Sequence, residues 1–203
     1  MVALAIPTDA PLISGPPQGR WTYADWESLP DDDNRYEIID GFLYRSTPPS
    51  YFHQWIIRRL DHSVGMPAEQ QGLGFAATAP VGLLMPGGDP VQPDFVFVLK
   101  EHAEIINDRK IRGVPDVIVE VISPGSVAYD ERVKLLAYAA AGVPEYGLIV
   151  PTERVVRLYK LDAPGRYAFP KTFTEGQSFS FGCLPELTVS VADLFAGSPD
   201  TTL

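Results

Sequence analysis

Pro115-Asp116-Val117-Ile118-Val119-Glu120-Val121-Ile122-Ser123-Pro124 is a strand-forming stretch that carries two carboxylates among β-branched residues. Side chains of a β-strand alternate between two faces. One face is predicted to hold Val117, Val119 and Val121. The other face is predicted to hold Asp116, Ile118, Glu120 and Ile122. A buried carboxylate without a partner is costly or becomes protonated. We therefore expect a group that compensates the charge of Glu120.

Two further segments are expected to place ionisable side chains near this strand. Residues 91–99 form a second apolar strand, which carries Asp94 directly after a proline and is expected beside the first strand. Residues 130–144 are predicted to contain a helix with Asp130 as N-cap, Gly142 as the C-terminal stop and Lys134 in its first turn. An Asp, a Glu and a Lys at strand ends suit metal-assisted phosphodiester hydrolysis, because carboxylates bind Mg²⁺ and an ammonium offsets developing negative charge.

Each of these residues also has a structural interpretation. Asp94 has the position of a turn residue after proline, and Lys134 that of a surface lysine paired with Asp130 or Glu131. Glu120 would need a buried ion pair, which rarely stabilises more than an apolar side chain does, so metal ligation is favoured. Asp116 lies at the entry of the strand, where a turn explains it equally well, and it is left out of the site.

Six pieces of the chain occur in a fixed order: Tyr36-Glu37-Ile38-Ile39-Asp40-Gly41, His53, Gln92-Pro93-Asp94, the stretch 115–124, Asp130 with Lys134 and Tyr138, and Ala141-Gly142-Val143-Pro144-Glu145-Tyr146. In these pieces, over residues 20–195, the chain resembles the Uma-two family of restriction-type endonucleases, a branch of the PD-(D/E)xK nuclease superfamily. The resemblance implies a restriction-endonuclease-like core, DNA as the partner and Mg²⁺ or Mn²⁺ as the cofactor.

The resemblance also implies roles for individual residues. Asp94 corresponds to the PD aspartate and Glu120 to the acid of (D/E)xK. The chain departs from that motif because Ile122 stands where the superfamily has lysine, and the resemblance implies that Lys134 on the following helix replaces it. Glu37 is interpreted either as a cross-strand partner on an exposed hairpin face or, as the family's Tyr-Glu pair implies, as a third acid at the metal.

Composition limits the function classes. The 203 residues carry a formal net charge of −10, which disfavours broad non-specific binding to nucleic acid, although a local basic patch can still steer DNA. The single cysteine, Cys183, fits a reducing compartment and a small buried side chain. The three histidines have no zinc-ligand spacing. No apolar run has the length of a membrane span and the N-terminus lacks a signal-peptide pattern, so a cytoplasmic location is expected.

The remaining pattern predicts a flexible arm over residues 1–20 followed by one domain over residues 21–203. The expected elements are a short helix capped by Thr22, a hairpin (35–39 and 42–46) with an Asp40-Gly41 turn, a helix over 51–64, one or two strands within 68–86, a polar connection over 101–112, strands over 146–150 and 154–160, short strands over 166–181 and a closing helix over 191–195. The strand carrying Glu120, its helix and the strand from residue 146 are expected to form a βαβ unit.

We therefore predict an α/β (α+β) domain with a mixed central sheet flanked by helices. The predicted activity is Mg²⁺-dependent endonuclease cleavage of DNA, with Asp94, Glu120 and Glu37 at the metal and Lys134 positioning water or stabilising the transition state. Cleavage of both DNA strands favours a homodimer. The alternative is a catalytically inactive nuclease fold that acts as a binding or assembly module, which the acidic charge and Ile122 favour.

Overall fold

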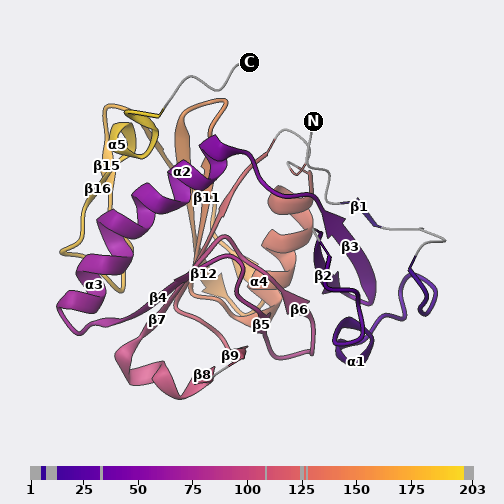
Figure 1. Cartoon of the computed structure of the whole chain (residues 1–203). Helices are drawn as coiled ribbons and strands as arrows, with labels where there is room; N and C mark the ends of the chain where they lie inside the picture. The colour runs from indigo at the N-terminus through magenta and orange to yellow at the C-terminus, as the bar shows by residue number, and fades with distance from the viewer. Residues whose placement is uncertain are drawn as a thin grey trace.

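Strand β10 (Val117–Val121) lies inside a seven-stranded mixed sheet (Figure 1). The computed structural model of the chain describes residues 6–7, 13–32, 34–107, 109–123, 126 and 128–198. The neighbours of β10 are the antiparallel strand β7 (Phe95–Leu99) and the parallel strand β11 (Glu145–Val150). The strands following Asp94 and carrying Glu120 are therefore adjacent, as predicted. The sheet is completed by β4 (Gly74–Thr78), β12 (Val155–Ala163), β13 (Arg166–Tyr167) and β14 (Lys171–Thr174).

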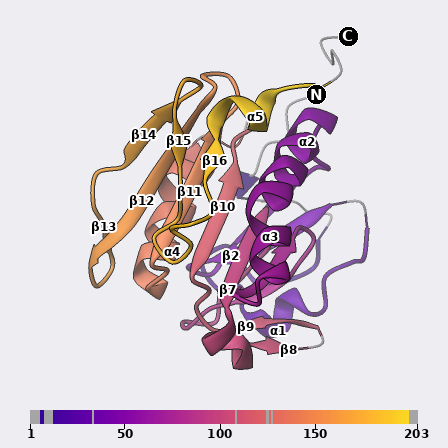
Figure 2. The ribbon, with the colours of Figure 1, turned by 90° about the vertical axis from the view of Figure 1, so that its left-hand side faces the viewer.

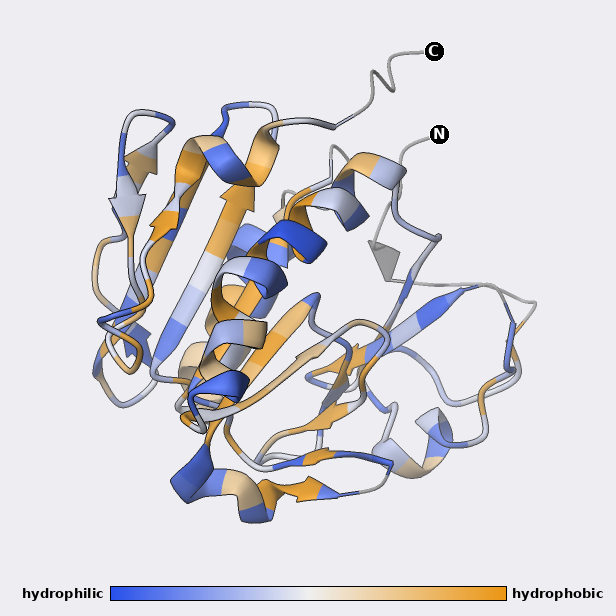
Figure 3. Ribbon diagram, turned by 60° about the vertical axis from the view of Figure 1, so that its left-hand side comes forward, coloured by the Kyte–Doolittle hydropathy of each residue, from blue (hydrophilic) through white to orange (hydrophobic). Residues whose placement is uncertain are grey.

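The two faces of β10 enter different hydrophobic clusters, as the alternation predicted. Val117, Val119 and Val121 share one cluster with α2 (Tyr51–Leu60), α3 (Met66–Gln70) and α5 (Val191–Phe195). Ile118 and Ile122 share the other with α4 (Leu135–Ala141) and the N-terminal hairpin. Figure 2 shows α2 and α3 on one side of the sheet and α4 on the other, and Figure 3 shows the largely hydrophobic central strands between them.

The connection from β10 to β11 confirms the predicted βαβ unit but corrects its helix start. The helix begins with a π-helical turn, η3 (Tyr129–Lys134), with Ala128 as N-cap. The prediction of Asp130 as N-cap is therefore wrong, since Asp130 lies within this first turn. A π-turn is wider than an α-turn and here places Tyr129, Asp130 and Lys134 all in buried positions. Residues 124, 125 and 127 of the preceding connection lie outside the described residues.

The hairpin of β2 (Arg35–Ile39) and β3 (Phe42–Ser46) forms as predicted. Its turn residues Asp40 and Gly41 have φ values of 52° and 74°, the positive values that a type I′ turn requires. With β1 (Ile6–Pro7) these strands make a separate three-stranded sheet. The helix α1 (Tyr23–Trp26) begins at Thr22, which forms a capping box with Asp25.

The expected arm contacts this hairpin where it is described. Gly19 N donates to Gly41 O at 2.8 Å, and the Gln18 amide bonds both backbone groups of Leu43. Residues 1–5 and 8–12 of the arm lie outside the described residues. The division into an arm and one domain at residue 20 stays a prediction.

The second helical run is longer than predicted. After α2 it continues through a π-helical turn, η1 (Asp61–Gly65), into α3, and so extends to residue 70, six residues beyond the predicted end at residue 64. Pro67 occupies the first turn of α3, where the missing N–H is tolerated. The run ends before Gly72, whose φ is 68°. Strands β4 and β5 follow within the predicted range.

The remaining elements are short. They are β5 (Leu83–Leu84), β6 (Pro90–Val91), the 3₁₀ helix η2 (Lys100–Ile105), β8 (Ile106–Asn107), β9 (Lys110–Arg112), β15 (Ser178–Phe179) and β16 (Val189–Ser190). The polar connection over 101–112 thus contains a 3₁₀-helical turn and the antiparallel strand pair β8–β9. Asp108 lies outside the described residues. Among the helices described, none combines the length and apolar character needed to cross a membrane.

Candidate active site

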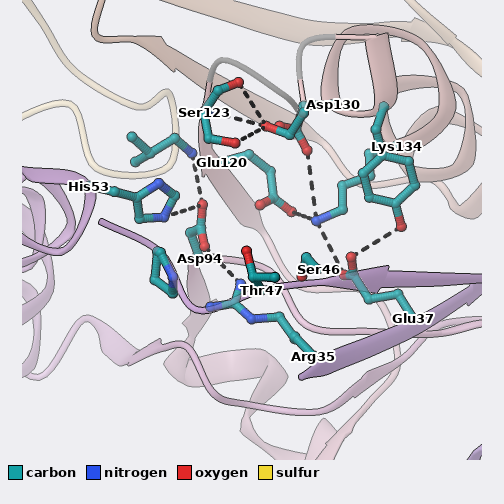
Figure 4. A pocket seen from close by; sticks show the side chains of 14 residues that line it. Arg35, Glu37, Ser46, Thr47, His53, Asp94, Glu120, Ser123, Asp130 and Lys134 are labelled. Carbon is teal, nitrogen blue, oxygen red and sulfur yellow. Dashed lines mark hydrogen bonds and ion pairs between the residues drawn. The ribbon is translucent and has the colours of Figure 1, made fainter. Parts of the chain in front are cut away.

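A small pocket opens between the hairpin, the N-terminal end of α2, β10 and η3 (Figure 4). All four residues that the sequence proposed for the site line it: Glu37, Asp94, Glu120 and Lys134. The other lining residues are Arg35, Ser46, Thr47, Pro49, His53, Val121, Ser123, Ser126, Tyr129 and Asp130. The charged side chains come from four separate segments of the chain, namely β2, the residue before β7, β10 and η3.

Lys134 lies at the centre of the acidic residues. Its Nζ is 2.9 Å from Glu120 Oε1, 3.2 Å from Glu37 Oε1 and 3.9 Å from Asp130 Oδ1. The Lys134 side chain is only 4% exposed, so these contacts are made away from bulk water. The interpretation as a surface lysine does not fit this burial. Lys134 instead reaches Glu120 from the helix, as the resemblance implied.

Two tyrosines fix the carboxylates around Lys134. Tyr138 OH donates to Glu120 Oε1 at 2.7 Å, and Tyr129 OH donates to Glu37 Oε2 at 3.1 Å. The Gln92 backbone N–H also donates to Glu37 Oε1 at 2.7 Å. Glu37 is therefore buried against the main sheet, and the interpretation that placed it on an exposed hairpin face is wrong. Both carboxylates are held in fixed orientations.

Asp94 is bound through both of its oxygens. Arg35 Nη1 donates to Oδ1 at 3.0 Å, and the Val121 backbone N–H donates to Oδ2 at 2.9 Å. His53 Nε2 lies 3.1 Å from the same Oδ2. The bond to Val121 joins Asp94 directly to the end of strand β10. A simple turn role does not account for this set of partners.

Among the lining residues that the sequence did not propose for the site are Arg35, His53 and Asp130. Arg35 lies two positions before Glu37 on β2, so strand alternation puts both on one face and could have identified it. Asp130 lies four positions before Lys134, a spacing that was interpreted as a cap or surface pair. No local pattern indicates that His53 reaches Asp94, forty-one positions later. Asp116 lies apart from the pocket, where it binds the Leu99 N–H and His102.

Comparison with known proteins identifies the family. The model of the Uma2 (Uma-two) family, described as putative restriction endonuclease, matches residues 22–192. The chain belongs to this family. No curated protein sequence matches this Uma-two chain significantly. Its fold is similar to that of a putative nuclease of the DUF820 group from Anabaena variabilis, with a TM-score of 0.73, 19% sequence identity, and coverage of 86% of this chain and 97% of that chain.

Burial and mutual repulsion control the protonation of the acids in this Uma-two pocket. Burial raises the pKa of Glu120 well above its ordinary value; Lys134 opposes the shift, and the neighbouring carboxylates add to it. Burial likewise raises the pKa of Asp130 to about 7, against the opposing charge of Lys134. Burial also acts to raise the pKa of Asp94, but His53 and Arg35 outweigh it and hold that pKa below the usual range.

The pKa of Lys134 moves in the direction that keeps its charge. Burial acts to lower it, but the surrounding carboxylates, Glu120 first among them, raise it above the ordinary value. The pocket thus holds a permanent cation among acids of which some resist ionisation. A cluster of acids that resist ionisation beside a single cation is expected to accept one more positive charge.

The charge of the pocket fits a divalent cation. With all four carboxylates ionised, the state that a bound cation would favour, and with His53 neutral, the charges of Lys134 and Arg35 leave a formal charge of two negative units. Within the part of the chain that is described, no three His, Cys, Asp or Glu side chains are arranged to hold a metal ion by themselves. Mg²⁺ commonly takes only one or two carboxylates and completes its shell with water and phosphate. The donor set therefore suits Mg²⁺ or Mn²⁺ bound together with a substrate.

Proposed function

We propose that this Uma-two protein is a Mg²⁺- or Mn²⁺-dependent endonuclease that hydrolyses phosphodiester bonds in DNA. The observation that carries the proposal is the enclosure of Lys134 by Glu37, Glu120 and Asp130, beside Asp94, in one pocket. Membership of a family described as restriction endonucleases supports DNA as the substrate class. The similarity of the fold to that of the putative nuclease from Anabaena variabilis supports a nuclease-like scaffold.

Each side chain has a role in this proposal. Asp94 and Glu120, assisted by Glu37, hold the metal ion. When bound, the ion polarises the phosphate and activates water for attack. Lys134 keeps its ammonium beside Glu120 and either positions the attacking water or offsets the negative charge of the pentavalent transition state. Tyr138 and Tyr129 hold the carboxylates that Lys134 contacts.

Two wider expectations belong to the same proposal. A homodimer would supply two pockets for cutting both strands of a duplex, and two-fold dimers are the commonest oligomers. The single cysteine fits a cytoplasmic protein. Size-exclusion chromatography with light scattering tests the first expectation, and localisation of the tagged protein tests the second.

Isothermal titration with Mn²⁺ and Mg²⁺, run beside a supercoiled-plasmid nicking assay, tests the activity. Wild type is expected to bind the ion and to nick DNA only in its presence. Glu120→Gln keeps the size of the side chain but cannot carry its negative charge, so it should fold but lose nicking by about 100-fold or more. Glu186→Gln is the matched control, because Glu186 is exposed and lies outside the pocket. Nicking by Glu120→Gln at the wild-type rate would refute the assignment.

The second candidate function is an inactive nuclease fold that binds or assembles with a partner. The engagement of Asp94 by Arg35 and of Glu120 by Lys134 favours it, because these cations neutralise the acids without a metal. A wild-type protein that neither binds Mn²⁺ or Mg²⁺ nor nicks DNA would support this second function. Metal binding with metal-dependent nicking would exclude it.

A further inference from the structure

His53 is a partly buried histidine whose two ring nitrogens are shielded from solvent and make no hydrogen bond to any of the described residues. It lies in the first turn of α2, where its backbone N–H donates to the capping Ser50 Oγ at 3.2 Å. Its side chain is 11% exposed. Among the described residues, neither Nδ1 nor Nε2 finds a hydrogen-bond partner with acceptable geometry. Buried polar atoms are nearly always hydrogen-bonded. We therefore expect the ring nitrogens of His53 to bind a group that is not a protein hydrogen-bond donor or acceptor.

The position of Nε2 suggests what that partner is. Nε2 lies 3.1 Å from Asp94 Oδ2, yet the direction does not suit a hydrogen bond. Two neighbouring ligands on an octahedral ion, with bonds of about 2.1 Å at right angles, are about 3 Å apart. The two atoms therefore have the separation of adjacent metal ligands. Figure 4 shows the His53 ring directed at this edge of Asp94 within the pocket.

The remaining contacts of Asp94 leave this edge available. Oδ1 is engaged by Arg35, and Oδ2 accepts the Val121 N–H at 2.9 Å. A carboxylate oxygen can take two partners, so Oδ2 can bind one more group besides the Val121 N–H. The imidazole and this oxygen form one ready pair of donors, and water and phosphate oxygens can complete the shell.

We infer that His53 is a ligand of the divalent ion, bound through Nε2 beside Asp94 Oδ2. The inference rests on the proposed function, which it extends by naming a nitrogen ligand. Imidazole suits first-row transition ions, whereas Mg²⁺ prefers an all-oxygen shell. The site should therefore bind Mn²⁺ more tightly than Mg²⁺. His62 and His102 are exposed and do not line the pocket, so neither competes for this role.

Pulsed electron paramagnetic resonance of Mn²⁺ bound to the full chain tests the inference. A directly bound imidazole gives a ¹⁴N modulation, and growth on ¹⁵N-histidine should replace it with the ¹⁵N pattern. This measurement uses the wild-type protein, so no variant has to fold. In His53→Gln the nitrogen modulation should be lost and the Mn²⁺ dissociation constant should rise by about tenfold or more. His62→Gln, an exposed change on the same helical run, should retain both.

The possible results separate this inference from the proposed function. Mn²⁺ bound by wild type without any histidine ¹⁴N modulation would overturn the role of His53 and leave a carboxylate-bound metal in place. Modulation that persists in a folded His53→Gln, checked by circular dichroism, would also overturn it. Wild type that binds no Mn²⁺ would overturn both the ligand assignment and the metal dependence of the proposed function.

Discussion

Lys134 Nζ lies 2.9 Å from Glu120 Oε1, although the two residues are fourteen positions apart in the chain. The (D/E)xK pattern would place the lysine two residues after the acid, on the same strand face. That position is Ile122, which is buried in the apolar cluster beneath α4. The helix after β10 returns over this face and presents Lys134 from its π-helical turn. The charge pair is therefore preserved with a lysine from a different element.

Replacing Lys134 by alanine should destabilise the protein strongly. It would leave Glu120, Glu37 and Asp130 buried without their common cation, and breaking a buried ion pair on one side costs about 3–5 kcal/mol. Urea unfolding followed by circular dichroism measures the loss. Added Mn²⁺ should restore part of the stability by replacing the missing charge. Lys100→Ala, at an exposed lysine, should change stability by less than about 0.5 kcal/mol.

Tyr138→Phe should weaken the orientation of Glu120 without removing its charge partner. The variant loses the 2.7 Å hydrogen bond to Oε1 but keeps the contact with Lys134. The expected loss is about 1–2 kcal/mol of unfolding free energy, with a several-fold weaker binding of Mn²⁺. Calorimetric titration and urea unfolding measure the two effects. Tyr51→Phe, at an exposed tyrosine, is the control, and an equal effect there would contradict the specific role of Tyr138.

Gly142→Ala should cost about 1 kcal/mol through the backbone alone. Gly142 ends α4 with a φ of 91°, a value that L side chains rarely adopt, and an added Cβ would meet no atom within 4 Å. Gly176 has equally open surroundings but no positive φ in that range, so Gly176→Ala should be neutral or slightly stabilising. Thermal unfolding of both variants checks the contrast.

The contact between exposed His102 and buried Asp116 should make stability depend on pH. A hydrogen bond from His102 to Asp116 and the charge of that carboxylate raise the pKa of His102 above its ordinary value of 6.5. A raised histidine pKa adds stability at pH below 6.5, and the gain disappears as pH rises through the folded-state pKa. The thermal midpoints of wild type and His102→Gln should therefore differ more at pH 5.5 than at pH 8.5. A difference that grows with pH would contradict this assignment.

Local patterns in the sequence predicted the scaffold because strand alternation and capping depend on neighbouring residues. The two faces of β10, the Asp40-Gly41 turn and the stop at Gly142 all follow from such short-range rules. The same short-range rules predicted that Glu120 lies inside a hydrophobic core, where its charge needs a partner, and Glu120 is buried. The pairing of acids with a lysine came from the family resemblance.

The site residues that the sequence did not identify are brought together by contacts between distant segments. Arg35 and Asp94 are fifty-nine positions apart, and the docking of two sheets brings them together. The burial of Asp130 depends on a π-helical turn, which no capping rule predicts. Strand periodicity gives the face on which a side chain lies but not the element opposite it. Strand alternation indicates the face of Arg35 but not its contact with Asp94, and the contacts of His53 and Asp130 follow only from the three-dimensional structure.

The hairpin that carries Arg35 and Glu37 belongs to a different sheet from Asp94 and Glu120. At the pocket, side-chain contacts such as Arg35 with Asp94 and Lys134 with Glu37 join the hairpin to the main sheet and the helical turn after β10. A molten form of the protein, with its strands formed but its sheets undocked, would keep its far-ultraviolet circular dichroism and have no pocket. The proposed ion binding at this pocket would therefore measure tertiary assembly directly, because it needs the docked sheets as well as the secondary structure.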